Sequence, residues 1–170
     1  MVEAIGDRAD LVVVAHSLGA FTAPLVCTRV PVELLVLVAA MVPRPGETAN
    51  DWWANTRLAE ARHEQRAYDD DEIELFLHDA EPDLAAEMLS RGRDQSDTPM
   101  REPWPLDAWP DVPTRYLLFR DDRVFPADFA RRLARERLGI EADEMDGSHT
   151  AYLSRPKELA ARLDAYRPAR

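Results

Sequence analysis

Three largely apolar runs that lack a regular alternation of polar residues point to the class of fold. They are Leu11 to Ala15, Leu34 to Ala40 and Thr114 to Phe119. A strand of this kind is covered on both faces, as happens in a parallel sheet that lies between helices. A shorter candidate strand, Ile140 to Met145, follows a helical pattern over Ala127 to Leu138. We therefore predict an α/β fold with a parallel sheet of about four strands and flanking helices.

The charge and the cysteine content exclude several kinds of partner and site. The 170 residues include 21 basic and 32 acidic side chains, a net charge of −11 that repels nucleic acid and anionic membrane surfaces. Cys27 is the sole cysteine, so an internal disulfide and a thiolate metal cluster are both excluded. This composition favours a reducing compartment, and we expect a cytoplasmic protein.

The remaining composition indicates no membrane anchor, metal or cofactor; the partner that we expect is a small-molecule substrate. The apolar runs are too short to span a membrane, and the acidic start of the chain is unlike a signal peptide. Lys157 is the only lysine and stands at a predicted helix entry, which leaves no plausible residue for Schiff-base chemistry or a phosphate-binding loop.

A serine motif follows the first apolar run. Ala15-His16-Ser17-Leu18-Gly19 stands where a buried strand turns into a helix. It resembles the nucleophile elbow of the α/β-hydrolase superfamily, with alanine in place of the first glycine. The resemblance implies that Ser17 is a nucleophile. The alternative is a serine that only caps the following helix.

In that superfamily an acid and then a histidine base follow the serine along the chain, and this order selects the base. His16 adjoins Ser17, whereas His63 and His78 precede any candidate acid strand. His149 remains, between the fourth candidate strand and the last helix, in the position that the resemblance implies for the base. A histidine in a surface turn is the alternative.

The acid is expected after the third strand, where a parallel sheet presents residues at its carboxyl edge. Asp121 and Asp122 both stand there. The family resemblance favours Asp122, because the acid commonly lies four residues before a proline, as Asp122 does before Pro126. Asp121 remains the alternative. The resemblance implies that the carboxylate holds His149 in the correct tautomer.

Further motifs look like the small branch that holds plant hydroxynitrile lyases and salicylate esterases. They are Asp122 to Pro126, Gly147 to His149 and Leu153 to Leu159. This resemblance implies a partial α/β-hydrolase fold with a mostly helical cap insertion. The predicted parts are a first half of the core over 1–46, the cap over 47–112 and a second half of the core over 113–170. Within the cap we predict helices over Asn50 to Ala67, Asp71 to Asp79 and Pro82 to Arg91.

The resemblance also assigns residues that would contact the substrate. The backbone N–H of Leu18 would be one oxyanion donor, and the second would come from a segment upstream of the elbow. The candidate substrate-binding side chains are His16, Trp52, Trp53 and Trp104. The cap aromatics Phe76 and Trp109 are further candidates to line a pocket, although most cap aromatics are expected to form its core.

The upstream strands of the superfamily are lacking, which would leave the strand at Leu11 to Ala15 unpaired on one side and open to self-association. Three functions follow from these residues. The first is a serine hydrolase acting on a carboxylic ester or a related small acyl substrate, impaired if its oxyanion hole is incomplete. The second is a non-catalytic hydrolase-like binding module. The third is a hydroxynitrile-lyase-type enzyme, which ranks lowest because no lysine lies near the acid loop.

Overall fold

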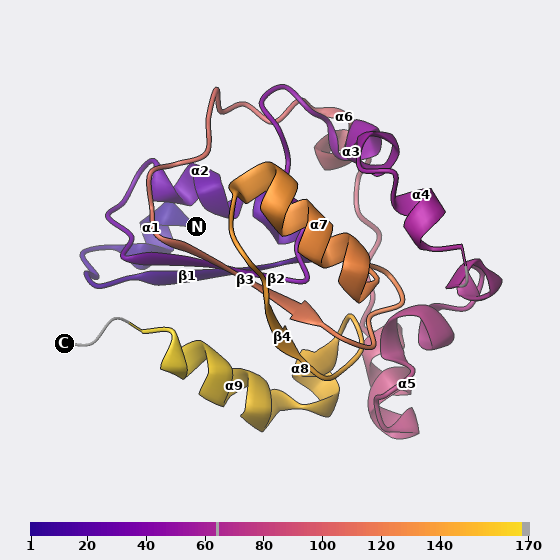
Figure 1. Ribbon diagram of the computed structural model, residues 1–170. Helices are drawn as coiled ribbons and strands as arrows, with labels where there is room; N and C mark the ends of the chain where they lie inside the picture. Colours follow the sequence, from indigo (N-terminus) through magenta and orange to yellow (C-terminus); the bar gives the residue numbers. More distant parts are fainter. Residues whose placement is uncertain (64, 168–170) are drawn as a thin grey trace.

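The computed structural model describes residues 1–63 and 65–167. Within them, four parallel strands form one sheet in the order β1-β2-β3-β4 (Figure 1). The strands are β1 (Val12–His16), β2 (Leu34–Val38), β3 (Thr114–Phe119) and β4 (Asp143–Met145). The predicted fold class and parallel sheet are confirmed, although β4 is shorter than the apolar pattern indicated.

The inner and outer strands of the sheet differ in burial. Every residue of β2 is buried, because this strand pairs with β1 on one side and with β3 on the other. Strand β1 pairs only with β2 among the described residues. The side chain of Val14, in the middle of β1, is consequently 47% exposed. The predicted open edge is thus an edge of the described sheet.

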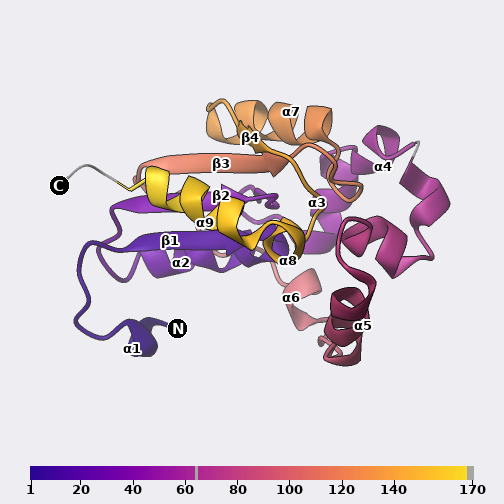
Figure 2. The ribbon, with the colours of Figure 1, turned by 90° about the horizontal axis from the view of Figure 1, so that it is seen from below.

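Alternate residues of the strands face two helical layers. On one face, Leu37 packs in a cluster with residues of α7 (Ala127–Leu138) and the start of α2 (Ala23–Cys27). On the other, Val36 packs in a cluster that includes the apolar stripe of α9 (Pro156–Ala165). Figures 1 and 2 show α9 on the opposite side of the sheet from α2 and α7. The sheet is therefore buried on both faces, as its unalternating apolar runs predicted.

The helix over Ala127–Leu138 has the bounds that the sequence predicts. It ends at Gly139, whose φ of 69° lies in the left-handed region that glycine adopts without strain. The remaining elements of the core are short: α1 (Val2–Ile5), the 3-10 helix η1 (Ser17–Phe21) and α8 (Ala151–Ser154). No helix in the described residues is long and apolar enough to cross a membrane.

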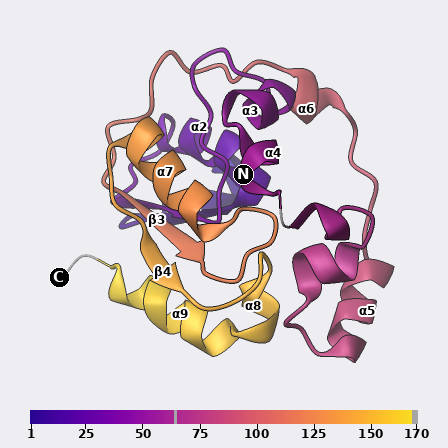
Figure 3. The same cartoon turned by 45° about the vertical axis from the view of Figure 1, so that its right-hand side comes forward.

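The insertion between β2 and β3 is built from short helices, and α4 and α5 lie beyond the arrowhead of β3 (Figures 1, 2 and 3). Its elements are α3 (Ala49–Asn55), α4 (Leu58–Ala61), the 3-10 helix η2 (Gln65–Tyr68), the π-helical turn η3 (Ile73–Leu77), α5 (Pro82–Ser90) and α6 (Thr98–Arg101). The mostly helical character is as predicted, and α5 matches the helix expected over Pro82 to Arg91 within one residue.

The single helix predicted over Asn50 to Ala67 is wrong. Helix α3 ends at Asn55, and the Thr56 hydroxyl donates a hydrogen bond of 2.7 Å to the backbone oxygen of Trp52 at this end. Arg57 then adopts a left-handed conformation with φ 57°, which no α-helix accommodates. Residue 64 of the predicted range lies outside the described residues.

A buried ion pair fastens the start of the insertion to the core. Arg137 of α7 donates to the carboxylate of Glu47, and both side chains are buried. Asn55 and the backbone N–H of Arg44 donate to the same carboxylate. Burial alone would raise the pKa of Glu47, but these hydrogen bonds outweigh it and hold the pKa below its usual range.

Candidate active site

Ser17 is the first residue of η1 and follows β1 directly, at a sharp turn. Its φ of 52° lies in the left-handed region, which is unusual for a residue other than glycine and is a strained conformation. Its backbone oxygen accepts a hydrogen bond from Met41, which ties the turn to the end of β2. A Cβ added at Gly19 would lie 3.9 Å from the Cβ of Ala15, an ordinary contact. Within the described residues, close packing against Ala15 therefore does not by itself require glycine at position 19.

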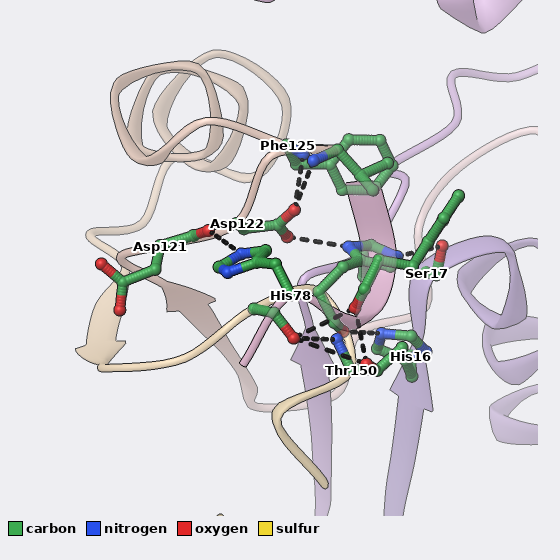
Figure 4. A network of polar contacts seen from close by, with 12 residues as sticks. His16, Ser17, His78, Asp121, Asp122, Phe125 and Thr150 are labelled. Carbon is green, nitrogen blue, oxygen red and sulfur yellow. Dashed lines mark hydrogen bonds and ion pairs between the residues drawn. The ribbon is translucent and has the colours of Figure 1, made fainter. Parts of the chain in front are cut away.

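The structure brings Ser17, His149 and Asp122 together, each from a loop at the carboxyl end of a different strand. Nε2 of His149 lies 3.0 Å from the Ser17 Oγ, and Nδ1 lies 2.8 Å from Oδ2 of Asp122 (Figure 4). His149 is 2% exposed and Asp122 is 3% exposed. The three groups form a continuous line of hydrogen bonds that is shielded from water except at the serine end.

The hydrogen bonds of Asp122 indicate which tautomer the His149 imidazole adopts. Oδ1 of Asp122 accepts from the backbone N–H groups of Val124 and Phe125, at 2.7 and 2.9 Å. These bonds fix the carboxylate so that Oδ2 faces His149. An ionised carboxylate only accepts hydrogen bonds, so Nδ1 of His149 carries the proton and Nε2 presents its lone pair to the Ser17 hydroxyl.

The structure separates the two candidate acids. Asp121 is exposed, and its Oδ2 accepts from the backbone N–H of Gly147 at 3.1 Å. Its backbone N–H in turn donates to the oxygen of Gly147. Asp121 therefore joins the acid loop (residues 120–126) to the base loop (residues 146–150), while Asp122 is the carboxylate that contacts the imidazole.

His16 contacts the base loop. Its Nε2–H donates a 2.8 Å hydrogen bond to the backbone oxygen of His149, and the two rings are 4.7 Å apart. Burial, and to a lesser extent repulsion by His149, lowers the pKa of His16 to about 4. The ring is therefore neutral near pH 7, and its Nε2–H is engaged by the protein.

The aromatic candidates occupy different environments. Trp52 is 0% exposed and packs on Phe125 and Phe129 in the core, so no substrate contact is proposed for it. Trp104 is also buried, and its indole N–H donates to the oxygen of Phe21 at 3.1 Å. The half-buried Trp53 packs edge-on against Trp52.

Two phenylalanines lie beside the imidazole. The ring of Phe125 is 5.0 Å from that of His149, and the ring of Phe76 is 5.6 Å away, both nearly perpendicular to it. Phe76 was an expected pocket residue, whereas sequence reasoning did not single out Phe125 as a site residue. Its place between Asp122 and Pro126, within the acid motif, could have indicated that Phe125 lies near the imidazole.

Two further features bear on the chemistry that this site supports. Leu18 follows Ser17 in the first turn of η1, where backbone N–H groups have no partner within the helix. Among residues 1–63 and 65–167, no group of three or more histidine, cysteine, aspartate or glutamate side chains is arranged to hold a metal ion. The described residues thus place a hydroxyl and an imidazole in hydrogen-bond contact, and the backbone N–H of Leu18 follows next in the chain.

Three solved structures, each at most 20% identical to this chain, share its fold. The chain resembles polyneuridine aldehyde esterase with a TM-score of 0.75 and 16% identity, over 96% of this chain and 74% of that protein. It resembles an extracellular alpha/beta-hydrolase from a Paenibacillus species with a TM-score of 0.75 and 20% identity, over 99% and 77% of the two chains. A pyrethroid hydrolase from Sphingobium faniae gives a TM-score of 0.71 and 20% identity, over 97% and 74%.

The sequence itself carries the family assignment. No match was found among curated protein sequences. The family described as "Alpha/beta hydrolase family" matches residues 1–162, which is nearly the whole chain. The fold agrees with this match, and the resemblance recognised from the serine, aspartate and histidine motifs is confirmed at the level of the superfamily. This chain belongs to the alpha/beta hydrolase family.

Proposed function

We propose that this protein is a serine hydrolase that cleaves carboxylic esters or related small acyl substrates. The observation that carries the proposal is the line of hydrogen bonds from Ser17 through His149 to Asp122, at 3.0 and 2.8 Å. A serine hydroxyl is a weak nucleophile unless an adjacent base removes its proton. The lone pair of His149 Nε2 is directed at that proton, and Asp122 stabilises the imidazolium that forms.

In the proposed first half-reaction, the Ser17 Oγ attacks the ester carbonyl as its proton passes to Nε2 of His149. A bond forms between Oγ and the carbonyl carbon, and the carbonyl oxygen becomes an oxyanion. The backbone N–H of Leu18 is the proposed donor to this oxyanion. The bond to the leaving alcohol then breaks, the alcohol takes the proton from His149, and an acyl-enzyme on Ser17 remains.

In the second half-reaction, a water molecule attacks the acyl carbon while His149 takes one of its protons. The bond from carbon to Oγ breaks, the proton returns to Ser17, and the carboxylic acid leaves. Trp53 is the proposed aromatic contact for the acyl or alcohol group, because it is the half-buried member of the three tryptophans predicted to contact the substrate. For His16 we propose a contact with substrate through the part of its ring that is not engaged with His149.

Labelling with a fluorophosphonate probe tests the proposal even while the substrate is unidentified. We expect the wild-type protein to be modified at Ser17, with peptide mass spectrometry locating the adduct. Ser17→Ala and His149→Ala should remain unlabelled because they lack the nucleophile and the base. Ser90→Ala, which removes a hydroxyl in the insertion that bonds the backbone of Glu87, is the matched control and should label normally.

The same experiment separates the competing functions. Equal labelling of the wild type and of His149→Ala would contradict activation by this histidine. An unlabelled but folded wild-type protein would refute the hydrolase proposal and favour the non-catalytic binding module.

A further inference from the structure

One turn of the insertion contacts both loops that carry the base and the acid. We call residues 73–79, which comprise the π-helical turn Ile73–Leu77 followed by His78 and Asp79, the brace segment. π-Helical turns are rare, and they occur frequently at functional sites. The contacts of the brace segment are with residues about 40 to 75 positions later in the chain, so they are tertiary contacts and not part of a local fold.

Asp79 holds the backbone immediately before the base. Its Oδ2 accepts a 2.9 Å hydrogen bond from the backbone N–H of Ser148 and a 2.8 Å hydrogen bond from the hydroxyl of Ser154. Ser148 is fully buried. If the carboxylate is removed, the Ser148 N–H is left buried without an acceptor, which costs folding free energy. The contact therefore holds the base loop against the insertion.

Phe76 holds the residues on either side of His149. Its backbone oxygen accepts hydrogen bonds from the Ser148 hydroxyl at 3.1 Å and from the Thr150 hydroxyl at 2.6 Å. Its ring meets the His149 imidazole edge to face. The insertion thus contacts His149 through its ring and through the side chains of its neighbours Ser148 and Thr150.

The brace segment also contacts the acid loop. Nε2–H of His78 donates to the backbone oxygen of Asp121 at 3.0 Å (Figure 4). Arg123 donates to the carboxylate and to the backbone oxygen of Glu74 at 2.6 and 2.8 Å. One short segment therefore sets the position of the acid loop and the base loop relative to each other.

We propose that Asp79 is a positioning residue, which holds the base loop through Ser148 so that His149 Nε2 meets the Ser17 hydroxyl. The proposal rests on the proposed hydrolase function. Burial alone would raise the pKa of Asp79, but hydrogen bonds from Ser148 and Ser154 outweigh it and leave the pKa below its usual range. The carboxylate is therefore ionised near pH 7 and makes strong, charge-assisted hydrogen bonds.

The kinetic test compares Asp79→Ala with Asp79→Asn on an activated ester. Alanine removes the oxygen that accepts both hydrogen bonds. We expect kcat to fall about tenfold to a hundredfold with KM little changed, because a small displacement of a reacting group is costly. Asparagine keeps one oxygen for both donors, but its N–H group replaces the buried Oδ1, which has no partner among the described residues. It should therefore restore kcat only in part. Asp70→Ala removes an exposed carboxylate of the same insertion and should leave kcat unchanged.

A second variant covers the case in which Asp79→Ala does not fold. Ser154→Ala removes one of the two donors to the carboxylate and leaves the other. It should lower kcat a fewfold, again without a change in KM. Thermal unfolding of each variant shows whether the loss of activity exceeds any loss of folded protein. An unchanged kcat in both Asp79→Ala and Ser154→Ala, measured on folded protein, would overturn the proposal.

A spectroscopic measurement separates this proposal from the proposed function. The Nδ1 proton of His149, buried and bonded to Asp122, should give a downfield proton NMR signal that is absent in His149→Ala. We expect Asp79→Ala to shift or broaden this signal and Asp79→Asn to preserve it, whether or not any ester is hydrolysed. An unchanged signal together with an unchanged kcat in Asp79→Ala would refute the positioning role. A wild-type protein without labelling or hydrolysis would refute the hydrolase function instead.

Discussion

The base loop contacts Ser17 through His149, and strand β1 directly precedes Ser17 in the chain. The two regions differ in how many neighbouring segments contact them. The base loop is fastened by the insertion, by the acid loop and by the His16 ring. Strand β1 pairs on one side only within the described residues, and its middle residue Val14 is about half exposed. The comparison teaches that His149 and Asp122, the proposed base and acid, are held by contacts between distant segments, whereas Ser17, the proposed nucleophile, is supported from one side.

The largest expected effect on activity comes from replacing Asp122, the proposed acid, whose loop contacts the base loop. Asp122→Asn should lower kcat for ester hydrolysis by a factor on the order of 10⁴, because an amide allows the imidazole to adopt the wrong tautomer. Asp121→Asn should cost less than about tenfold, since it weakens one hydrogen bond to Gly147. Steady-state kinetics of the two variants measure the ranking. The opposite ranking would transfer the role of the acid to Asp121.

The second prediction concerns His16, the last residue of β1, whose ring bonds the backbone of the base loop. Because the pKa of this ring is lowered from 6.5 to about 4 in the fold, its neutral form contributes stability that is fully present above pH 6.5. That stability is lost as the pH falls towards 4, because the unfolded chain then binds the proton first. The loss amounts to at most about 3 kcal/mol.

Urea unfolding at pH 7 and at pH 4.5 measures this contribution. Wild-type protein should lose more stability between the two conditions than His16→Gln, whose amide donates to the same backbone oxygen without titrating. Parallel pH dependence in the two proteins would mean that His16 is not kept neutral by the fold.

The smallest expected effect concerns the open side of β1. We expect self-association through the strand at Leu11 to Ala15, visible as an apparent mass that rises with concentration in size-exclusion chromatography with light scattering. Val14→Lys should weaken it roughly fivefold, because charged residues oppose edge-to-edge pairing. Leu89→Lys changes an exposed apolar residue of α5 and should have no such effect. A wild-type monomer at every concentration would contradict the expectation.

Sequence reasoning went furthest where local pattern and physical cause coincide. The apolar runs predicted the strands because a strand buried on both faces has few polar residues. Gly139 predicted the end of a helix because glycine readily adopts the left-handed conformation found there. The chain order implied by the family resemblance selected His149, and the family spacing before Pro126 favoured Asp122 over Asp121. The structure places both residues in one line of hydrogen bonds with Ser17.

What the sequence did not reveal depends on contacts between distant segments. The bond from Asp79 to Ser148 spans 69 residues, and the bond from His16 to His149 spans 133. Neither leaves a periodic signal, because one joins two loops and the other joins the end of β1 to a loop. The break at Arg57 was missed for a related reason. A left-handed arginine has no favourable local propensity, so the sequence around Arg57 does not indicate the break.

The sheet order β1-β2-β3-β4 follows the order of the chain, and this has a consequence for synthesis. Each strand can add to the edge left by the previous one as the polypeptide leaves the ribosome, without waiting for a later strand to insert. The arrangement of Ser17 with His149, however, is complete only when most of the chain has emerged. A nascent chain that stops before residue 149 should therefore resemble the folded core in part and yet react with no fluorophosphonate.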